Sequence, residues 1–236
     1  MQALNRIMVI TNALSTHSPQ GLTISQLSES TDLPLGTLHR ILTAMTNHRF
    51  VEFNPDTKFY TLGDVWMQYG LQVYDQFDYV SKIRPLMDQL AKQTNESIYM
   101  HKPLENESMI VERIDGPNNR IHIIDQLGLR TPIPLNAANQ IILAHRTILE
   151  KKENDTRLTH HFLEKIILDG FVALEDETKE TISIAVPIIA KNGQLVTVIS
   201  LSALTFSLTT ERKEFLLAEL FKTKRGIEES LYYFQK

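Results

Sequence analysis

Apolar positions recur at helical spacing through the first fifty residues, and they predict three short helices. The first covers residues 2–14, and Pro19 and Gly21 break the pattern after it. A second helix follows at once, and either Thr23 or Ser25 can cap it. After the break "TDLPL", the third helix has a buried stripe at i, i+3, i+4 and i+7, formed by Leu38, Ile41, Leu42 and Met45.

Residues 51–63 change from helical spacing to alternation. Two short runs of alternating apolar residues flank Asn54, Pro55 and Asp56, which favour a turn, so the segment predicts a β-hairpin. Three helices followed by a hairpin is the order of a winged helix-turn-helix. We therefore expect residues 1–63 to form a DNA-binding domain of this type.

A longer helical pattern follows from residue 64 to residue 80. Its stripe is rich in aromatic residues, and it consists of Trp66, Tyr69, Val73, Phe77 and Val80. Such a stripe packs either on a partner subunit or on the chain's own core. We expect residues 64–80 to form a linker and dimerisation helix, which leaves residues 81–236 as a separate effector-binding domain.

The remaining pattern predicts a mixed domain. Residues 81–95 form a helix, and β-rich runs follow at residues 97–102, 108–114, 120–125, 170–176, 181–190 and 195–204. Asn192-Gly193 is a strong turn signal between the last two runs, so they form an antiparallel hairpin. Two helical stretches lie between residues 136 and 168, and a long helix begins near Thr210. The chain is therefore expected to be α+β, with a mainly antiparallel sheet.

Composition places the chain among ordinary globular proteins. Hydrophobic residues make up 42% of its 236 residues and charged residues 22%. Its apolar runs are too short for a membrane span, and the N-terminus lacks the pattern of a signal peptide, so we expect a cytoplasmic protein without membrane partners. The chain has no cysteine, which excludes disulfides, thiol nucleophiles and thiolate metal sites.

The segment that contains the predicted third helix has no acidic residues. No Asp or Glu occurs from Leu33 through Val51, and the face opposite the buried stripe carries hydrogen-bond donors: Thr37, His39, Arg40, Thr43 and Asn47. Residues 1–63 hold four bases and four acids, so the net charge of −4 belongs to the rest of the chain. Phosphate neutralisation drives non-specific DNA binding, so each subunit is expected to bind weakly and to need a homo-oligomeric partner.

Each of these polar features also has a simpler interpretation. The donor-bearing face can be an ordinary solvated helix surface, but the predicted helices and wing favour contact with DNA. Lys58, at the tip of the hairpin, either neutralises a phosphate or solvates a turn. His161 and Glu164 stand one helical turn apart, but two ligands make a weak metal site, so no metal is predicted.

The motifs together resemble the IclR family of bacterial transcriptional regulators. The run Leu33–Leu42 resembles the family's "glp-K-S-T-v-h-R-l-l" motif, and Tyr60–Gly63 resembles the end of its wing. Gly170–Val172, Ser183–Pro187 and Val196–Ser202 resemble motifs of its C-terminal domain. The resemblance spans most of the chain, and it implies a GAF-like effector domain and a homodimer or dimer of dimers on an imperfectly palindromic operator.

The resemblance also implies an effector pocket for a small polar or carboxylate metabolite. Ser200 and Ser202 share one face of a strand, Ser183 lies on its hairpin partner, and all three match pocket positions of the family. Ala138 and Asn139, near a helix start, can offer backbone N–H groups to a carboxylate. Glu175 matches an acidic family position loosely.

This chain departs from the family pattern at several positions. Leu35-Gly36 stands where Lys-Ser is usual, and Asn139-Gln140 replaces Gly-Lys in a segment that is two residues shorter. Ser183 stands where Cys is frequent, and the stretch from His145 to Asp169 is shortened. The effector pocket is therefore expected to be remodelled.

Catalysis is not indicated by any motif in the chain. It has no Ser-His-Asp order, no Gly-rich phosphate loop and no supported pair of carboxylates, so neither catalytic residues nor a cofactor are expected. The alternative is a small-molecule-binding enzyme whose N-terminal helices only mediate association. Salt-dependent DNA binding distinguishes the two, since it is expected only of the regulator.

Overall fold

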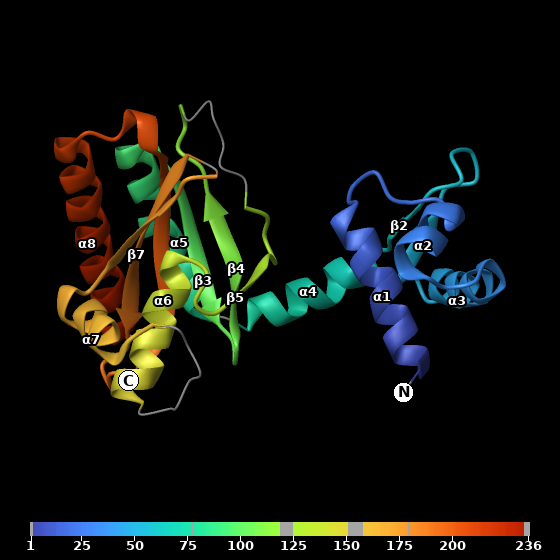
Figure 1. Ribbon diagram of the computed structural model, residues 1–236, viewed down its shortest axis with the longest axis horizontal. Helices are drawn as coiled ribbons and strands as arrows, with labels where there is room; N and C mark the ends of the chain where they lie inside the picture. Colours follow the sequence, from blue (N-terminus) through green and yellow to red (C-terminus); the bar gives the residue numbers. More distant parts are fainter. Residues whose placement is uncertain (1, 77, 119–124, 151–157, 179, 234–236) are drawn as a thin grey trace. The chain divides into compact units, whose positions relative to one another are not determined.

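A computed structural model of the protein shows two compact units, Met1–Phe77 and Asp78–Lys236 (Figure 1). The structure describes residues 2–76, 78–118, 125–150, 158–178 and 180–233. None of the helices in this part of the chain is long and apolar enough to cross a membrane. The assignment of separate roles to the two units stays a prediction.

The N-terminal unit has the three helices and the hairpin that the sequence predicts. Its elements are α1 (Gln2–Thr16), α2 (Ile24–Thr31), α3 (Leu35–Asn47), β1 (Val51–Phe53), β2 (Tyr60–Leu62) and α4 (Val65–Asp75). A capping box begins α2, because the Thr23 hydroxyl accepts from the Gln26 N–H and the Gln26 side chain accepts from the Thr23 N–H. The predicted stripe of α3 packs with residues of α1, α2 and β1 in one core.

The prediction of a single helix over residues 64–80 is wrong, because the described residues belong to two helices. The first, α4, ends at Asp75, and α5 begins at Asp78. The predicted stripe is accordingly divided. The Trp66 Nε1–H donates to the Phe50 carbonyl oxygen at 2.8 Å, Tyr69 and Val73 are exposed, and Val80 is buried in the other unit. Phe77 lies outside the described residues.

The described part of the C-terminal unit forms a six-stranded sheet with helices on both faces. Its helices are α5 (Asp78–Thr94), α6 (Ala137–Ala144), α7 (His160–Asp169) and α8 (Thr210–Tyr233). Its strands are β3 (Ser97–Pro103), β4 (Glu107–Ile114), β5 (Arg130–Pro132), β6 (Val172–Asp176), β7 (Thr181–Ile189) and β8 (Leu195–Leu204). The order is β5-β4-β3-β8-β7-β6, and each neighbouring pair is antiparallel.

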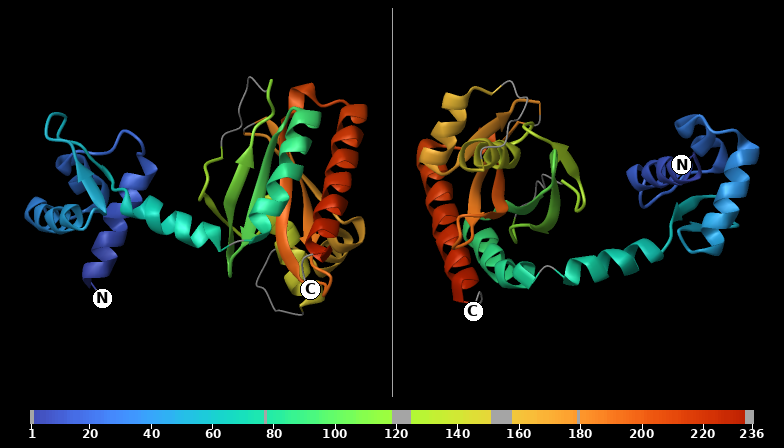
Figure 2. Two further views of the ribbon diagram at one scale, coloured as in Figure 1. Left: turned by 180° about the vertical axis from the view of Figure 1, so that it is seen from behind. Right: turned by 90° about the horizontal axis from the view of Figure 1, so that it is seen from below.

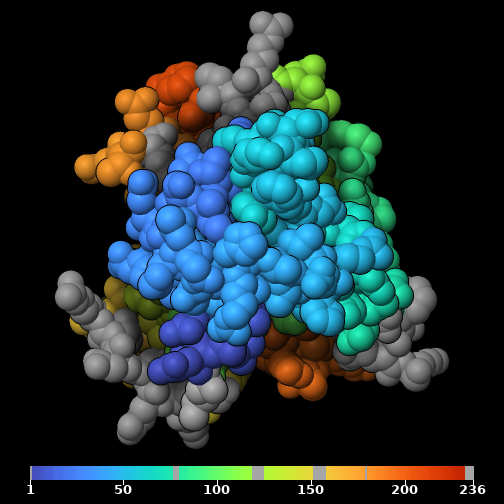
Figure 3. Space-filling view, turned by 90° about the vertical axis from the view of Figure 1, so that its right-hand side faces the viewer, coloured from blue at the N-terminus to red at the C-terminus, as the bar shows by residue number. Residues whose placement is uncertain are grey.

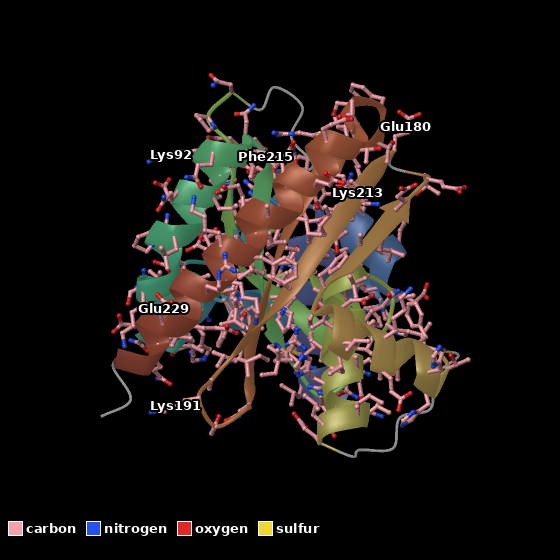
Figure 4. The ribbon with its side chains drawn as sticks, turned by 90° about the vertical axis from the view of Figure 1, so that its left-hand side faces the viewer. Lys92, Glu180, Lys191, Lys213, Phe215 and Glu229 are labelled. Atoms are coloured by element: carbon pink, nitrogen blue, oxygen red, sulfur yellow. The ribbon has the colours of Figure 1, made fainter. Side chains whose placement is uncertain are left out.

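The register of the central strands assigns residues to the two faces. Ser200 pairs with Tyr99 and Ala185, and this face packs against α6. Leu201 pairs with Ile98 and Ile184 on the other face, where α5 and α8 lie side by side (Figures 2 and 4). In Figure 4, Lys191 marks the turn between β7 and β8, and Phe215 lies on α8.

Most predicted strands agree with the observed ones. The β7–β8 hairpin turns at Asn192-Gly193, where Gly193 has φ +84° and its N–H donates to the Ala190 carbonyl oxygen at 2.8 Å. The strand predicted at residues 120–125 falls almost entirely outside the described residues. The short β5 was not predicted, and a π-helical turn, His145–Leu149, continues α6.

Among the described residues of the C-terminal unit, His101 and His145 are buried. Burial lowers the pKa of His101 to about 4. It also lowers the pKa of His145 to about 4, with the positive charge of Lys224 acting in the same direction and Glu150 opposing it. Both imidazoles are therefore neutral at neutral pH, and protonation opposes folding.

We expect these histidines to make stability depend on pH between about 6.5 and 4. In this window the unfolded chain binds protons at both side chains, whereas the folded chain does not. The free energy of unfolding should therefore fall as the pH is lowered, by roughly 1–3 kcal/mol for each histidine. Urea unfolding at pH 7.0, 6.0 and 5.0 measures this, with His145→Gln as the comparison. An unchanged pH slope in His145→Gln would contradict the assignment.

Candidate nucleic-acid interface and ligand cavity

The predicted polar face of α3 is directed outward because the opposite stripe is buried. Leu38, Leu42 and Met45 are almost fully buried in the core of the N-terminal unit. Among the donor-bearing residues, Thr37 is half-buried. The exposed ones are His39, Arg40, Thr43 and Asn47. The N-terminal unit faces the viewer in Figure 3, with the start of the chain in dark blue and the hairpin region in cyan. The predicted residues thus lie on one helix, and their contact with DNA stays a prediction.

The individual side chains of this face differ in what they can offer. Arg40 has no carboxylate partner among the described residues, so its charge is available. The Thr43 hydroxyl donates to the His39 carbonyl oxygen at 2.7 Å, which leaves Thr43 its methyl group and an acceptor lone pair. Arg40 is therefore the strongest candidate for a phosphate or guanine contact.

The first turn of α3 is open and lacks a side-chain cap. Pro34 is the N-cap, Leu35 is 53% exposed, and a Cβ added at Gly36 would meet no atom within 4 Å. The first backbone bonds of the helix run from the Thr37 and Leu38 N–H groups to the Pro34 carbonyl oxygen. The N–H groups of Leu35 and Gly36 thus have no acceptor within the helix, and they can approach a phosphate closely.

The hairpin tip places Lys58 in solvent. The Asn54 side chain accepts from the N–H groups of Asp56 and Thr57 at 2.9 and 3.1 Å, which fixes the turn. Lys58 has φ +61°, and its N–H donates to the Asn54 carbonyl oxygen at 2.9 Å. The Lys58 side chain is exposed, and Asp56 lies two residues before it. Both predicted roles, neutralising a phosphate and solvating the turn, are compatible with this position.

The C-terminal unit contains a cavity of about 100 Å³ on the α6 face of the sheet. Strands β3, β6, β7 and β8 line it, and the start of α6 covers one side. Of the residues predicted to bind an effector, it brings together Ala138, Ser183, Ser200 and Ser202. Ser183 and Ser202 are register partners in the β7–β8 hairpin, so their side chains point to the same face.

Two other predicted residues lie elsewhere. Asn139 is buried, but its side-chain amide donates to the carbonyl oxygens of Thr131 and Pro132 at 2.8 and 2.9 Å. Its backbone N–H donates to the Asn136 side chain at 2.8 Å, so neither donor group is available to a ligand. Asn139 thus holds the β5 segment against α6. The N–H of Ala138 has no acceptor within the helix.

Glu175 is exposed and lies apart from the cavity, because strand alternation turns it to the opposite face. Leu174 pairs with Ser183 and Asp176 pairs with Thr181, so Leu174 and Asp176 line the cavity instead. The acidic residue that β6 contributes to this site is therefore Asp176. The sequence could have identified Asp176 only if the β6–β7 register had been known, because the register shows which residues of β6 share a face with Ser183.

The structure also adds residues that the sequence did not single out. Tyr99, His101, Asp125 and Thr181 line the cavity. Burial raises the pKa of Tyr99, so its phenol is protonated at neutral pH. The His101 Nε2 lies 2.8 Å from the Ser200 hydroxyl oxygen. No local motif marks His101, because its partner is almost a hundred residues away in the sequence.

The cavity and the exposed helix can be compared with known proteins. Residues 3–55 match the IclR helix-turn-helix domain, and residues 71–229 match the family described as bacterial transcriptional regulator IclR C-terminal. The HTH-type transcriptional regulator KipR of Bacillus subtilis is 24% identical over 252 aligned positions, which cover 99% of this chain and 100% of KipR.

Solved structures show the same fold. An IclR transcriptional regulator from Alicyclobacillus acidocaldarius has a TM-score of 0.77 at 17% identity, and the match covers 98% of both chains. An IclR homologue from Microbacterium hydrocarbonoxydans, complexed with 4-hydroxybenzoate, has a TM-score of 0.76 at 19% identity, covering 97% of this chain and 98% of that one. The family matches span both units, and the chain belongs to the IclR family of bacterial transcriptional regulators.

Proposed function

We propose that the protein is a cytoplasmic transcriptional regulator that binds its operator through α3 and responds to a small metabolite in the cavity of the C-terminal unit. The observation that carries the DNA-binding part is the exposed face of α3, which has donors and no acid. Thr37, His39, Arg40, Thr43 and Asn47 contact the major groove, and Lys58 contacts the backbone beside it. We infer binding rather than catalysis, in line with relatives that are transcriptional regulators.

The functional form is a homo-oligomer, either a dimer or a dimer of dimers. The first 63 residues have no net charge, so one subunit has little general attraction to DNA. Several large apolar side chains of the N-terminal unit are exposed: Leu4, Met8 and Val9 on α1, and Met67, Leu71 and Val73 on α4. This much exposed apolar surface supports an interface with a second subunit.

An apolar hollow in the same unit supports this assignment. It has a volume of about 590 Å³, and mainly apolar side chains of α1 and α3 line it together with Phe50 and Trp66. Its polar lining residues are Gln2, Arg6, Arg40 and His48, so Arg40 borders this hollow as well as the outward face of α3. Leu4 and Met8 belong both to the hollow and to the exposed surface. A partner helix packed against Leu4 and Met8 on α1 would bury both and leave Arg40 of α3 accessible to DNA. Two-fold symmetry would then place two copies of α3 on an imperfectly palindromic operator.

The cavity is proposed as the effector site for a small polar or carboxylate metabolite. Ser183 and Ser202 supply hydroxyl groups from paired strands, and the Ala138 N–H at the start of α6 adds a backbone donor. The homologue that is complexed with 4-hydroxybenzoate supports a small organic effector. Binding would couple to DNA affinity by stabilising one arrangement of the dimer over another.

Arg40→Ala is expected to weaken operator binding by about 1–3 kcal/mol, or roughly 5- to 150-fold, because it removes the uncompensated cation of α3. Fluorescence anisotropy with DNA selected from genomic fragments measures the affinity. The control is Arg225→Ala, which removes an exposed arginine from α8 in the other unit. Equal affinities of Arg40→Ala and wild type would refute the assignment.

Leu71→Lys is expected to shift the sedimentation coefficient towards the monomer and to weaken operator binding, because it places a charge on the proposed apolar interface. The matched control is Leu168→Lys, at a residue of α7 that is 85% exposed. A wild-type protein that sediments as a monomer at micromolar concentration and still binds DNA tightly would contradict the oligomeric proposal.

Ser183→Ala/Ser202→Ala is expected to weaken effector binding about tenfold, because it removes two hydroxyl donors and leaves the bond between His101 and Ser200 intact. The fluorescence of Trp66, the single tryptophan, serves as the signal during titration with 4-hydroxybenzoate, glycolate or glycerol. Isothermal calorimetry checks the affinities independently. Unchanged affinity for a compound that binds the wild type would show that these serines are ordinary strand residues.

A further inference from the structure

His101 is held in a defined position at the wall of the cavity. Its strand, β3, lies between β4 and β8, where His101 pairs with Ile110 and Val198. The His101 carbonyl oxygen also accepts from the buried Thr197 hydroxyl at 2.8 Å. His101 is 6% exposed and lines the cavity. Its backbone is thus fixed from both sides.

One nitrogen of this imidazole has a partner and the other does not. The Nε2 atom lies 2.8 Å from the Ser200 hydroxyl oxygen. The Nδ1 atom is buried and has no hydrogen-bond partner among the residues that the structure describes. A buried polar atom without a partner costs about 1–3 kcal/mol of stability and is rare in folded proteins. Because His101 lines the cavity, a molecule bound there is a candidate partner that the described residues do not supply.

A comparison with Asn139 shows why His101 stands out. The Asn139 Oδ1 is also buried without a partner, but the amide nitrogen of the same side chain makes two hydrogen bonds to the β5 segment. Asn139 does not line the cavity, and its bonds account for its position as a structural residue. The Nδ1 of His101 has no such structural explanation.

We propose that His101 determines the ligand specificity of the cavity, through a hydrogen bond between its Nδ1 atom and an oxygen atom of a small metabolite. This inference rests on the proposed effector site. Ser200 then acts through His101 as a positioning residue, because its hydroxyl group is bonded to Nε2.

The chemistry of a neutral imidazole defines the group that it recognises. One ring nitrogen carries the proton and donates, and the other accepts. When the Ser200 hydroxyl donates to Nε2, Nδ1–H donates to a carbonyl or carboxylate oxygen of the metabolite. When Nε2–H donates to Ser200, Nδ1 accepts from a hydroxyl group. In both states the metabolite must place an oxygen there, and a methyl group at the same position leaves Nδ1 unpaired.

Two isosteric substitutions separate this role from a structural one. Gln at position 101 places its amide group near the original Nε2 position and removes Nδ1, whereas Asn places its amide group near Nδ1 and removes Nε2. The affinity of each variant for 4-hydroxybenzoate, glycolate and glycerol is measured by calorimetry, and its stability by urea unfolding without a ligand. His145→Gln is the control, because His145 is a second buried histidine of the same unit and does not line the cavity.

We expect His101→Gln to keep most of its stability and to lose at least about tenfold in affinity for the compound that binds the wild type. His101→Asn should lose stability and keep more of its affinity than His101→Gln does. His145→Gln should leave the affinity unchanged.

The opposite pattern, with full affinity in His101→Gln, would show that only the bond to Ser200 matters, and it would overturn the inference while leaving the effector site in place. A wild type that binds none of the three compounds would count against the proposed effector function itself.

Discussion

The two-residue alternation of the central strands β3, β8 and β7 is the constraint on which the C-terminal unit depends. Because neighbouring strands are in register, residues that pair also share a face. Leu201 with Ile98 and Ile184 forms an apolar layer under α5 and α8, whereas Ser200 faces α6 beside Tyr99. A slip of one residue in any strand would exchange these faces and bury the serines beneath the helices. The apolar core and the polar cavity are thus two results of the same register.

The elements around the cavity are held together by hydrogen bonds and packing contacts with one another. The Asn136 side chain caps α6, and Asn139 bonds α6 to the β5 segment. The apolar residues of α6 pack with Val172, Ala185 and Val198 in one cluster beside the cavity. With these contacts satisfied, polar side chains such as His101 can face the cavity and retain unused hydrogen-bonding capacity. That capacity reduces stability, and a ligand of complementary chemistry can use it.

The N-terminal unit shows a different division between structure and function. Its core is formed by one stripe of α3 together with residues of α1, α2 and β1, so the outward face of α3 does not pack in this core. The same unit exposes apolar side chains on α1 and α4 and carries no net charge over its first 63 residues. A surface of this kind does not suit a monomer that binds DNA by charge alone. In the proposed dimer, the affinity for DNA would come from geometry, because two copies of α3 would be held at a defined spacing.

The sequence by itself determined the local elements of this protein. Helical spacing identified the helices of the N-terminal unit, Asn192-Gly193 identified the β7–β8 hairpin, and alternation placed Ser200 and Ser202 on one face. These features depend on neighbours within a few residues. Only the tertiary structure decided that α4 ends at Asp75, that Asp176 rather than Glu175 lines the cavity, and that Asn139 bonds to β5. It alone joined His101 to Ser200. Register and packing between distant segments set these features, and no local pattern of side chains encodes them.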